Sequence, residues 1–535
     1  MTTSSLTRAF VERTRILYER SQYISYAYAL SHPDHLAMMA RLFGLTPPDP
    51  ADARILEIGC ASGGNLIPLA MNSPRARYLG IDLSESQIEN GREHIAALGL
   101  ENVDLEALDL LEFDPGEQEF DYIIAHGVYS WVPPEVRERI LELARRHLSP
   151  HGIAYVSYNC YPGWHINEIS RYLMYRNCDH IGDPGTRYST AMGLLQEFAA
   201  VAKDSDAFPL ARIYRECHAS LQDLGQDYVL HEYLEPVNTP FYFRDFVFNC
   251  ANRDLAYVCD AELTPMLLSS RPQAIQDLIG RIANNRLETE EYLDFIDART
   301  FRSSLLTHAS HELDLDIRPQ LLMQMQAACR LEVKDREGDK YRLGLPGGDE
   351  DDLHTGSNIL RHAVELMHAA WPCSLAIDDL FMNSAGAAGY TLDTLDDQQL
   401  TREIERFTHD LLMLYVMGHL ELSLTAPACS NQISDHPRLS PLALRQAKLG
   451  NDRLTSQKHQ NIPCGKGRQN FLAHLDGRHD RQRLQAILAG EIRKGVIPVE
   501  AGGIRPATLA GNPKMVAEVY AAILNELKDN ALIIG

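Results

Sequence analysis

The chain has 535 residues, of which 45% are hydrophobic, and a formal net charge of -23. This length exceeds what one compact core usually holds, so about three domains are expected. The acidic balance argues against a nucleic-acid partner, since phosphate binding requires a basic face. The basic stretch between Arg438 and Arg483 is interpreted as a solvated loop and helix face.

Signals for export, membranes and metals are absent from the sequence pattern. The first residues lack the apolar core of a secretory signal, and no stretch approaches the roughly 20 apolar residues of a membrane span. The ten cysteines never form Cys-x-x-Cys, and the histidines are too dispersed to indicate a metal site. A reducing, cytoplasmic compartment is the simplest interpretation.

Residues 1–46 are predicted to form a helical N-terminal segment that ends at Pro47-Pro48-Asp49-Pro50. Apolar strands then alternate with helices, among them Ser84–Leu98 and Pro134–Leu148. The predicted strands are Arg54–Ile58, Arg77–Ile81, Val103–Ala107, Phe120–Ala125 and Gly152–Tyr158. This alternation predicts an α/β fold with a parallel sheet that helices cover on both faces.

A core over residues 47–263 is expected to contain a helical insertion at 164–226. After the insertion, Tyr228–Leu234 and Leu255–Asp260 are predicted as strands that close the sheet with an antiparallel edge. A helix is predicted between them, over Phe243–Cys250.

The rest of the chain divides into two predicted regions. Residues 264–348 are expected to be helical to about Ala328, followed by a hairpin of Cys329–Val333 and Lys340–Leu343. Gly347–Asp352 is a candidate linker. Residues 354–535 are predicted to be a helix-rich domain, and both a winged-helix-like module and a plain helical bundle stay open.

A glycine loop, Gly59-Cys60-Ala61-Ser62-Gly63, follows the first predicted strand, and Glu57 precedes it. Such a loop lets the backbone approach a ligand closely, and the next helix N-terminus favours a carboxylate. Asn65 falls in the first turn of that helix. Alanine at position 61 is a mild departure from the common pattern, which has glycine there.

Acidic residues end the next two strands. Asp82 is placed to accept hydrogen bonds from both hydroxyls of a ribose, and Asp109 from an adenine amine. The ordered set predicts an S-adenosylmethionine site. Its predicted residues are Tyr26, Glu57, Gly59, Cys60, Ala61, Gly63, Asn65, Asp82, Leu83, Asp109, Leu110, His126 and Gly127.

A nicotinamide-binding Rossmann domain is the rival interpretation, because Gly59-x-Ala61-x-x-Gly64 also loosely fits that fingerprint. Two residues argue against it. Dinucleotide folds need no acid at the position of Glu57, and Asp109 has a natural adenine role only in the methyltransferase interpretation.

The set resembles the class I methyltransferases. A narrower resemblance covers His126–Pro133, Ser157–Trp164 and the stretch from Tyr18 to Tyr26, which are similar to bacterial methyltransferases that carry a methyltransferase regulatory domain. That group includes protein lysine methyltransferases acting on outer-membrane proteins. The resemblance implies a seven-stranded Rossmann-like core, a regulatory segment at about 220–300 and a related C-terminal element at Leu472–Arg481.

Tyr129 and Trp131 follow the fourth strand and Asn159 ends the fifth, where such sheets bind ligands. An aromatic pocket disfavours a charged amine and can hold a cation against a ring face. These three residues are therefore the candidate catalytic residues, with Tyr161 and Trp164 behind them. Packing roles for both tryptophans, and a helix cap for Asn159, are the alternatives.

The stretch Tyr23-x-Ser25-Tyr26 is interpreted either as a lid over the cofactor or as a helix-packing seam. The leading functional hypothesis is a protein lysine N-methyltransferase, whose polypeptide substrate would be met in the cytoplasm and could be an outer-membrane protein. Homodimer formation stays open. A small-molecule methyltransferase and a non-catalytic cofactor-binding scaffold are the alternatives, because a fold alone does not fix a function.

Overall fold

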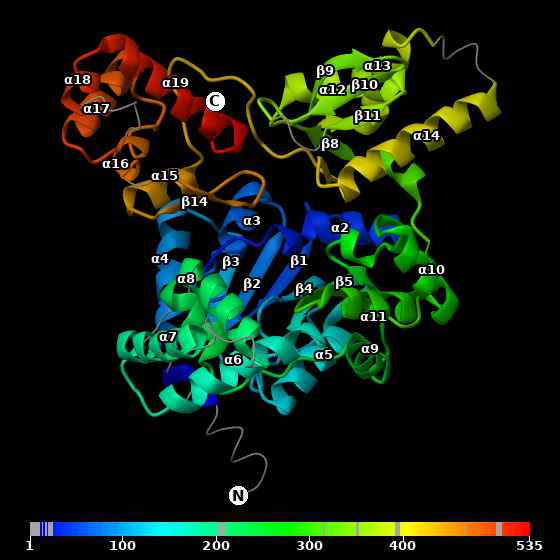
Figure 1. Ribbon diagram of the computed structural model, residues 1–535, viewed down its shortest axis with the longest axis vertical. Coiled ribbons are helices and arrows are strands. Elements are labelled where there is room, and N and C mark those ends of the chain that lie inside the picture. The colour runs from blue at the N-terminus through cyan, green and yellow to red at the C-terminus, as the bar shows by residue number, and fades with distance from the viewer. Residues whose placement is uncertain are drawn as a thin grey trace, which may run out of the picture.

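The computed structural model describes residues 11–12, 14–16, 19, 25–201, 209–313, 316–348, 352–390, 396–465, 467–498 and 506–534. Its centre is a seven-stranded sheet with the strand order β3-β2-β1-β4-β5-β7-β6 (Figure 1). The strands are β1 (Arg54–Ile58), β2 (Arg77–Asp82), β3 (Val103–Ala107), β4 (Phe120–Ala125), β5 (Leu148–Asn159), β6 (Leu255–Asp260) and β7 (Phe301–His308).

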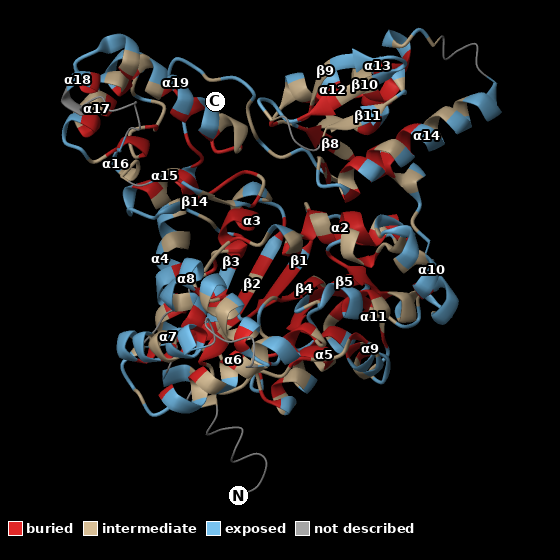
Figure 2. Ribbon diagram, viewed as in Figure 1, coloured by how far each residue is buried: buried red, intermediate tan, exposed pale blue. Residues whose placement is uncertain are grey.

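The first five strands run parallel, and β7 is antiparallel to both of its neighbours, β5 and β6. The five strands predicted from apolar runs are confirmed, as is the strand at Leu255–Asp260. The residues of β1, β4 and β5 are largely buried (Figure 2), because helices cover both faces. Adjacent residues accordingly separate into two hydrophobic clusters, with Ile55 on one face and Leu56 on the other.

Helices fill the two faces of the sheet. On the Ile55 face lie α2 and α3, and on the Leu56 face lie α5 and α9. The predicted helices at Ser84–Leu98, Pro134–Leu148 and Phe243–Cys250 are confirmed. The elements are η1 (Ala29–Ser31), α2 (Pro33–Leu42), α3 (Leu66–Asn72), α4 (Glu85–Leu98), α5 (Pro134–His147), α9 (Phe243–Ala251), η3 (Thr264–Met266), η4 (Leu268–Ser270), α10 (Gln273–Ile282) and α11 (Arg286–Asp297).

The prediction for the last strands is partly wrong. Tyr228–Leu234 is not a strand, since it continues α8 (Ala211–Tyr233), whose Val229, Leu230 and Tyr233 are buried against α6 (Gly163–Cys178) and α7 (Pro184–Val201). A buried helical face here has the same apolar content as a strand, so composition misled the prediction.

The seventh strand is β7, in a stretch that the sequence analysis expected to be helical. Its run Arg302-Ser303-Ser304 is too polar to suggest a buried strand, yet all three side chains are buried. The sheet therefore takes in residues well beyond position 263.

Arg302 explains how so polar a strand can be buried. Its side chain is 1% exposed and lies over the ring of Phe243, with Cζ 3.7 Å from the ring centroid. The guanidinium donates to the carboxylates of Asp260 at 2.8 Å, Asp294 at 2.9 Å and Glu290 at 3.2 Å. A buried charge is tolerated when it is paired and hydrogen-bonded in this way. The cluster ties β6, β7 and α11 together.

A middle region follows the sheet. Its elements are η5 (Pro319–Gln324), β8 (Gln326–Cys329), β9 (Glu332–Glu337), β10 (Lys340–Gly344), β11 (Leu353–Thr355), α12 (Asn358–Ala370), β12 (Leu375–Ala376), α13 (Ile377–Ala387), α14 (Asp397–Val416) and β13 (Leu420–Ser423). The predicted hairpin is confirmed as β9 and β10, although Cys329 belongs to β8. Residues 349–351 of the candidate linker lie outside the described residues.

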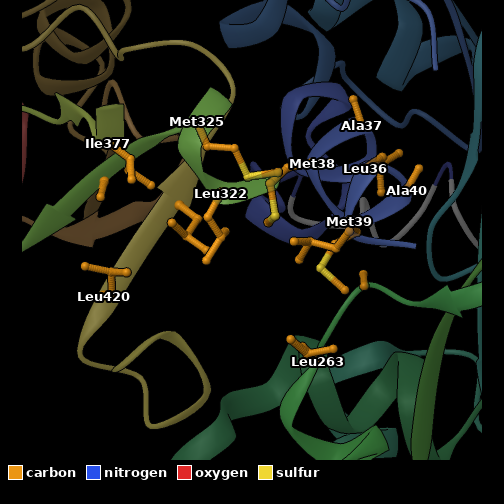
Figure 3. Packing of buried hydrophobic residues seen from close by; sticks show 14 of the residues in the cluster. Leu36, Ala37, Met38, Met39, Ala40, Leu263, Leu322, Met325, Ile377 and Leu420 are labelled. Carbon is orange, nitrogen blue, oxygen red and sulfur yellow. The ribbon is translucent and has the colours of Figure 1, made fainter. Parts of the chain in front are cut away.

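The middle region shares a hydrophobic cluster with the core. In Figure 3, Met38 and Met39 of α2 lie close to Leu322 and Met325. The C-terminal region has a separate cluster. Its elements are α15 (Pro441–Lys448), β14 (Arg453–Thr455), β15 (Asn461–Pro463), α16 (Gln469–Leu472), α17 (Arg481–Arg493), α18 (Pro506–Ala510) and α19 (Pro513–Asp529). Among the described helices, none combines the length and apolar content of a membrane span.

Candidate active site

The predicted glycine loop lies between β1 and α3 and lines a cavity at the carboxyl ends of the parallel strands. Gly59 and Gly63 have positive φ angles of 76° and 74°. Ala61 has a φ of 47°, in the left-handed region that favours glycine. Its N–H donates to Asp82 Oδ2 at 2.8 Å. The backbone at position 61 therefore keeps a conformation typical of glycine.

Glu57 is a buried carboxylate at the wall of this cavity. Its Oε1 accepts a hydrogen bond from Asn65 Nδ2 at 2.8 Å, whereas Oε2 has no hydrogen-bond partner within the described residues. Burial raises the pKa of Glu57 to about 8, because a charged carboxylate loses hydration there. An unpartnered buried acceptor of this kind is suited to a cationic or hydrogen-bond-donating ligand group.

The acidic residues after β2 and β3 lie on the same cavity. Asp82 accepts from the N–H groups of Ala61 at 2.8 Å and Ser84 at 2.9 Å, and burial raises its pKa. Asp109 is half-buried and accepts from the N–H of Leu111 at 3.0 Å. Both carboxylates thus face one space from neighbouring strand ends, as the sequence order suggested.

The N-terminal segment 25–31 crosses the glycine loop. Ser25 Oγ accepts from the N–H of Gly64 at 2.7 Å, and the N–H of Tyr28 donates to Asn65 Oδ1 at 3.0 Å. Ser25, Tyr26 and Tyr28 line the cavity. Tyr23, which the lid interpretation also used, and Tyr18 of the family resemblance lie outside the described residues. Ser25 and Tyr28 were missed as cavity residues because only a long-range contact brings them there.

His126 follows β4 and lies beneath Tyr28, with ring centroids 3.9 Å apart. Its Nδ1 is 2.9 Å from the hydroxyl of Tyr155, which donates to Ser303 Oγ at 3.0 Å. Burial lowers the pKa of His126 to about 4, so the ring is neutral at ordinary pH.

All of the predicted cofactor residues except Gly63 line the cavity.

The three predicted catalytic residues do not all line the cavity. Trp131 lines the cavity, but Tyr129 and Asn159 do not. Tyr129 is 3% exposed and packs edge-on against Phe246, with centroids 5.5 Å apart. Asn159 is buried and donates to Asn238 Oδ1 at 3.0 Å. The structure thus corrects the placement of Tyr129 and Asn159 in the pocket, since the turn after β4 directs Tyr129 into the core.

The residues expected behind the pocket have structural partners. Tyr161 donates to Glu168 Oε1 at 2.8 Å. Trp164 is buried and lies edge-on to Trp131, with centroids 6.4 Å apart. Trp164 therefore supports Trp131 from behind.

Helix α8 supplies a part of the cavity that the sequence analysis missed. His231 and Glu232 of this helix, and Glu235 just beyond its end, line the cavity together with Trp131 and Val132. Burial raises the pKa of Glu232 to about 7. Because this stretch was predicted as a strand of the sheet, no signal assigned these side chains to the site.

Comparison with known proteins identifies the family. The family described as "Methyltransferase domain" matches residues 56–154, and "Predicted methyltransferase regulatory domain" matches 225–308. "PKMT, C-terminal winged helix domain" matches 435–532. An uncharacterised protein of Rickettsia prowazekii is 37% identical over 233 residues, which cover 44% of this chain and 93% of that protein. The chain is a class I S-adenosylmethionine-dependent methyltransferase.

Two further relatives extend along nearly the whole methyltransferase. A second uncharacterised protein of Rickettsia prowazekii is 28% identical over 526 residues, covering 97% of this chain and 93% of that one. The structure of PKMT2 from Rickettsia typhi in complex with AdoHcy is 27% identical, covers 96% and 100% of the two chains, and has a TM-score of 0.83. Another structure of PKMT2 gives 0.81. The predicted family, fold class and cofactor are confirmed, and the dinucleotide alternative is excluded.

At Gly64 the N-terminal segment lies directly against the glycine loop of the methyltransferase. A Cβ at this position would stand 2.3 Å from the carbonyl oxygen of Ser25. We expect Gly64→Ala to displace residues 25–28 and to weaken AdoHcy binding about tenfold in a calorimetric titration. Gly193→Ala is the matched control, because nothing lies within 4 Å of a Cβ there. Unchanged affinity in Gly64→Ala would show that the segment does not shape the site.

Proposed function

We propose that this methyltransferase transfers methyl groups to lysine side chains of a polypeptide. The observation that carries the proposal is the acidic and aromatic lining of the cavity, to which Glu232, Glu235 and Trp131 all contribute. Carboxylates attract an ammonium group, and an indole face holds a cation. The same charge disfavours an anionic small-molecule acceptor. The resemblance of the sequence to bacterial protein lysine methyltransferases, together with the similarity to PKMT2 over nearly the full chain, supports the same acceptor.

The cavity residues fit the parts of S-adenosylmethionine. We assign the ammonium of the ligand to the unpartnered Oε2 of Glu57 and its carboxylate to the glycine loop before α3. Asp82 would accept from the ribose hydroxyls and Asp109 from the adenine amine, with the apolar side chains of Leu83 and Leu110 beside the base. The remaining cavity residues, Tyr26, Cys60, His126 and Gly127, would complete the walls.

When bound, S-adenosylmethionine supplies a methyl group that a neutral amine takes in line with the sulfur, which keeps the bonding electron pair. A lysine ammonium, with an ordinary pKa of about 10.4, must first lose a proton. Glu232 is suited to accept it, because its pKa of about 7 matches that task near neutral pH. Trp131 would orient the side chain. Tyr129 has no part in this scheme, since it is buried in the core.

The proposal also covers the origin of the acceptor and the compartment in which it is methylated. We propose an acceptor from the cell envelope, such as an outer-membrane protein, that is methylated in the cytoplasm. The ten free cysteines agree with a reducing compartment.

We also propose a homodimer, because large apolar side chains of the helical insertion are exposed. These include Ile166, Tyr172, Phe198 and Leu224.

The acceptor class is tested with radiolabelled S-adenosylmethionine and a cell-envelope extract. We expect label in polypeptides, recovered as methyl-lysine after acid hydrolysis and stable to base. Label found only in small molecules would contradict the lysine proposal. Tight AdoHcy binding without any turnover would instead favour a non-catalytic scaffold.

The role of Glu57 predicts a pH dependence of ligand binding. The carboxylate pairs with the ammonium of AdoHcy only when ionised, so affinity should fall by up to tenfold per unit as pH decreases below about 8. Glu57→Gln should weaken binding and remove this slope between about pH 6 and 8. Asp82, whose pKa is also raised, is present in both proteins, so its titration does not account for a difference between them. Calorimetry measures both effects. The exposed substitution Glu93→Gln should keep the slope, and a slope retained in Glu57→Gln would exclude the assignment.

The role of Glu232 is tested by Glu232→Gln. We expect kcat/KM for a lysine-containing substrate to fall about 100-fold, because the proton acceptor is lost, while AdoHcy affinity is unchanged. Glu197→Gln, on the exposed side of α7, is the matched control. A wild-type kcat/KM in Glu232→Gln would exclude Glu232 as the proton acceptor.

A further inference from the structure

A turn of the C-terminal winged-helix region reaches the cofactor loop. This turn, residues 456–460, joins β14 to β15, and Figure 1 shows β14 beside α3. His459 is 2% exposed, and its Nε2 lies 2.7 Å from Asn65 Oδ1. A side chain that is 394 positions away in the sequence thus contacts the first residue before α3.

Asn65 uses its full hydrogen-bonding capacity. Its Nδ2 donates to Ser31 Oγ at 3.1 Å and to Glu57 Oε1 at 2.8 Å. Its Oδ1 accepts from the N–H of Tyr28 at 3.0 Å and from His459 Nε2 at 2.7 Å. An amide has two donors and one oxygen with two lone pairs, so all four positions are occupied. Rotation of the amide would break every one of these bonds.

The network fixes the protonation of His459. The oxygen of Asn65 cannot donate, so the hydrogen of the pair is on Nε2 of the imidazole. Burial lowers the pKa of His459 well below its ordinary value, so the ring is neutral. Its Nδ1 has no hydrogen-bond partner within the described residues. The single N–H of this buried ring is therefore directed at Asn65.

The turn is held in place for this contact. His459 has a φ of 57°, an unfavourable left-handed conformation for a residue with a Cβ. The backbone N–H of His459 donates to the carbonyl of Ser456 at 3.0 Å. Two residues on, Asn461 Nδ2 donates to the carbonyl of Ala27 at 2.7 Å, and its Oδ1 accepts from the N–H of Ala27 at 3.3 Å. The hairpin thus holds both Asn65 and the segment that crosses the glycine loop.

We propose that His459 is a positioning residue of the cofactor site, through which the winged-helix region orients Asn65 and hence Glu57. The inference rests on the role proposed above for Glu57. Without the N–H of His459, the oxygen of Asn65 keeps only the N–H of Tyr28, and its amide is less restrained. Glu57 then loses the fixed donor on Oε1, and a buried carboxylate without a donor pairs less well with a ligand cation.

The test compares three full-length variants with the wild type by calorimetric titration with AdoHcy. His459→Phe fills a similar space without a donor, and we expect it to weaken binding about tenfold. His459→Gln restores an N–H and should bind within about threefold of wild type. Arg445→Met is the matched control, because Arg445 Nε donates to His94 Nδ1 at 3.0 Å and so also joins the winged-helix region to the core, through a bond that does not involve Asn65. It should bind as wild type.

Combining His459→Phe with Glu57→Gln separates this inference from the role of Glu57. If His459 acts through Glu57, the double variant should bind no more weakly than Glu57→Gln alone. Additive losses would overturn the inference, and so would equal losses in His459→Phe and His459→Gln. If Arg445→Met lost as much AdoHcy affinity as His459→Phe, the effect of His459 would be explained by domain packing alone, and the inference would be rejected. Unchanged binding in Glu57→Gln would instead reject the role of Glu57. Thermal denaturation establishes that each variant is folded.

Discussion

The buried carboxylate of Glu57 is the constraint around which the cofactor site is built. Ionisation at this position is costly, as its pKa of about 8 shows, yet a cationic ligand needs the ionised form. One hydrogen bond from Asn65 partly offsets this cost. Asn65 is in turn fixed by Ser31, Tyr28 and His459, which come from opposite ends of the chain. A single unfavourable charge thus explains why distant segments converge there.

A second buried charge stabilises the edge of the sheet that β7 and β6 form. Arg302 on β7 is surrounded by carboxylates from β6 and α11. Removing one partner of such a cluster leaves an uncompensated charge, so the group holds together as a unit. All of these residues lie within the 225–308 match to the methyltransferase regulatory domain. That segment is therefore an integral part of the sheet, because it contributes two of the seven strands.

The sequence was sufficient wherever local pattern determines structure. The apolar strands, the glycine loop and the acids at Asp82 and Asp109 were predictable, because each follows directly from the local pattern at the end of its own strand. Tyr129 was misplaced, since the path of a turn decides whether an aromatic side chain faces a cavity or the core. The positions of Glu232 at the cavity and of His459 at Asn65 were not predictable, because each depends on packing between segments far apart in the sequence.

The order of the strands has a consequence for how the protein is made. β7 lies between β5 and β6 although it follows both in the sequence. Nascent chains fold from the N-terminus as they emerge from the ribosome, so this sheet stays open at one edge until residue 308 is synthesised. The turn that carries His459 emerges later still. A full complement of contacts around Asn65 therefore marks a chain whose translation has passed the winged-helix hairpin.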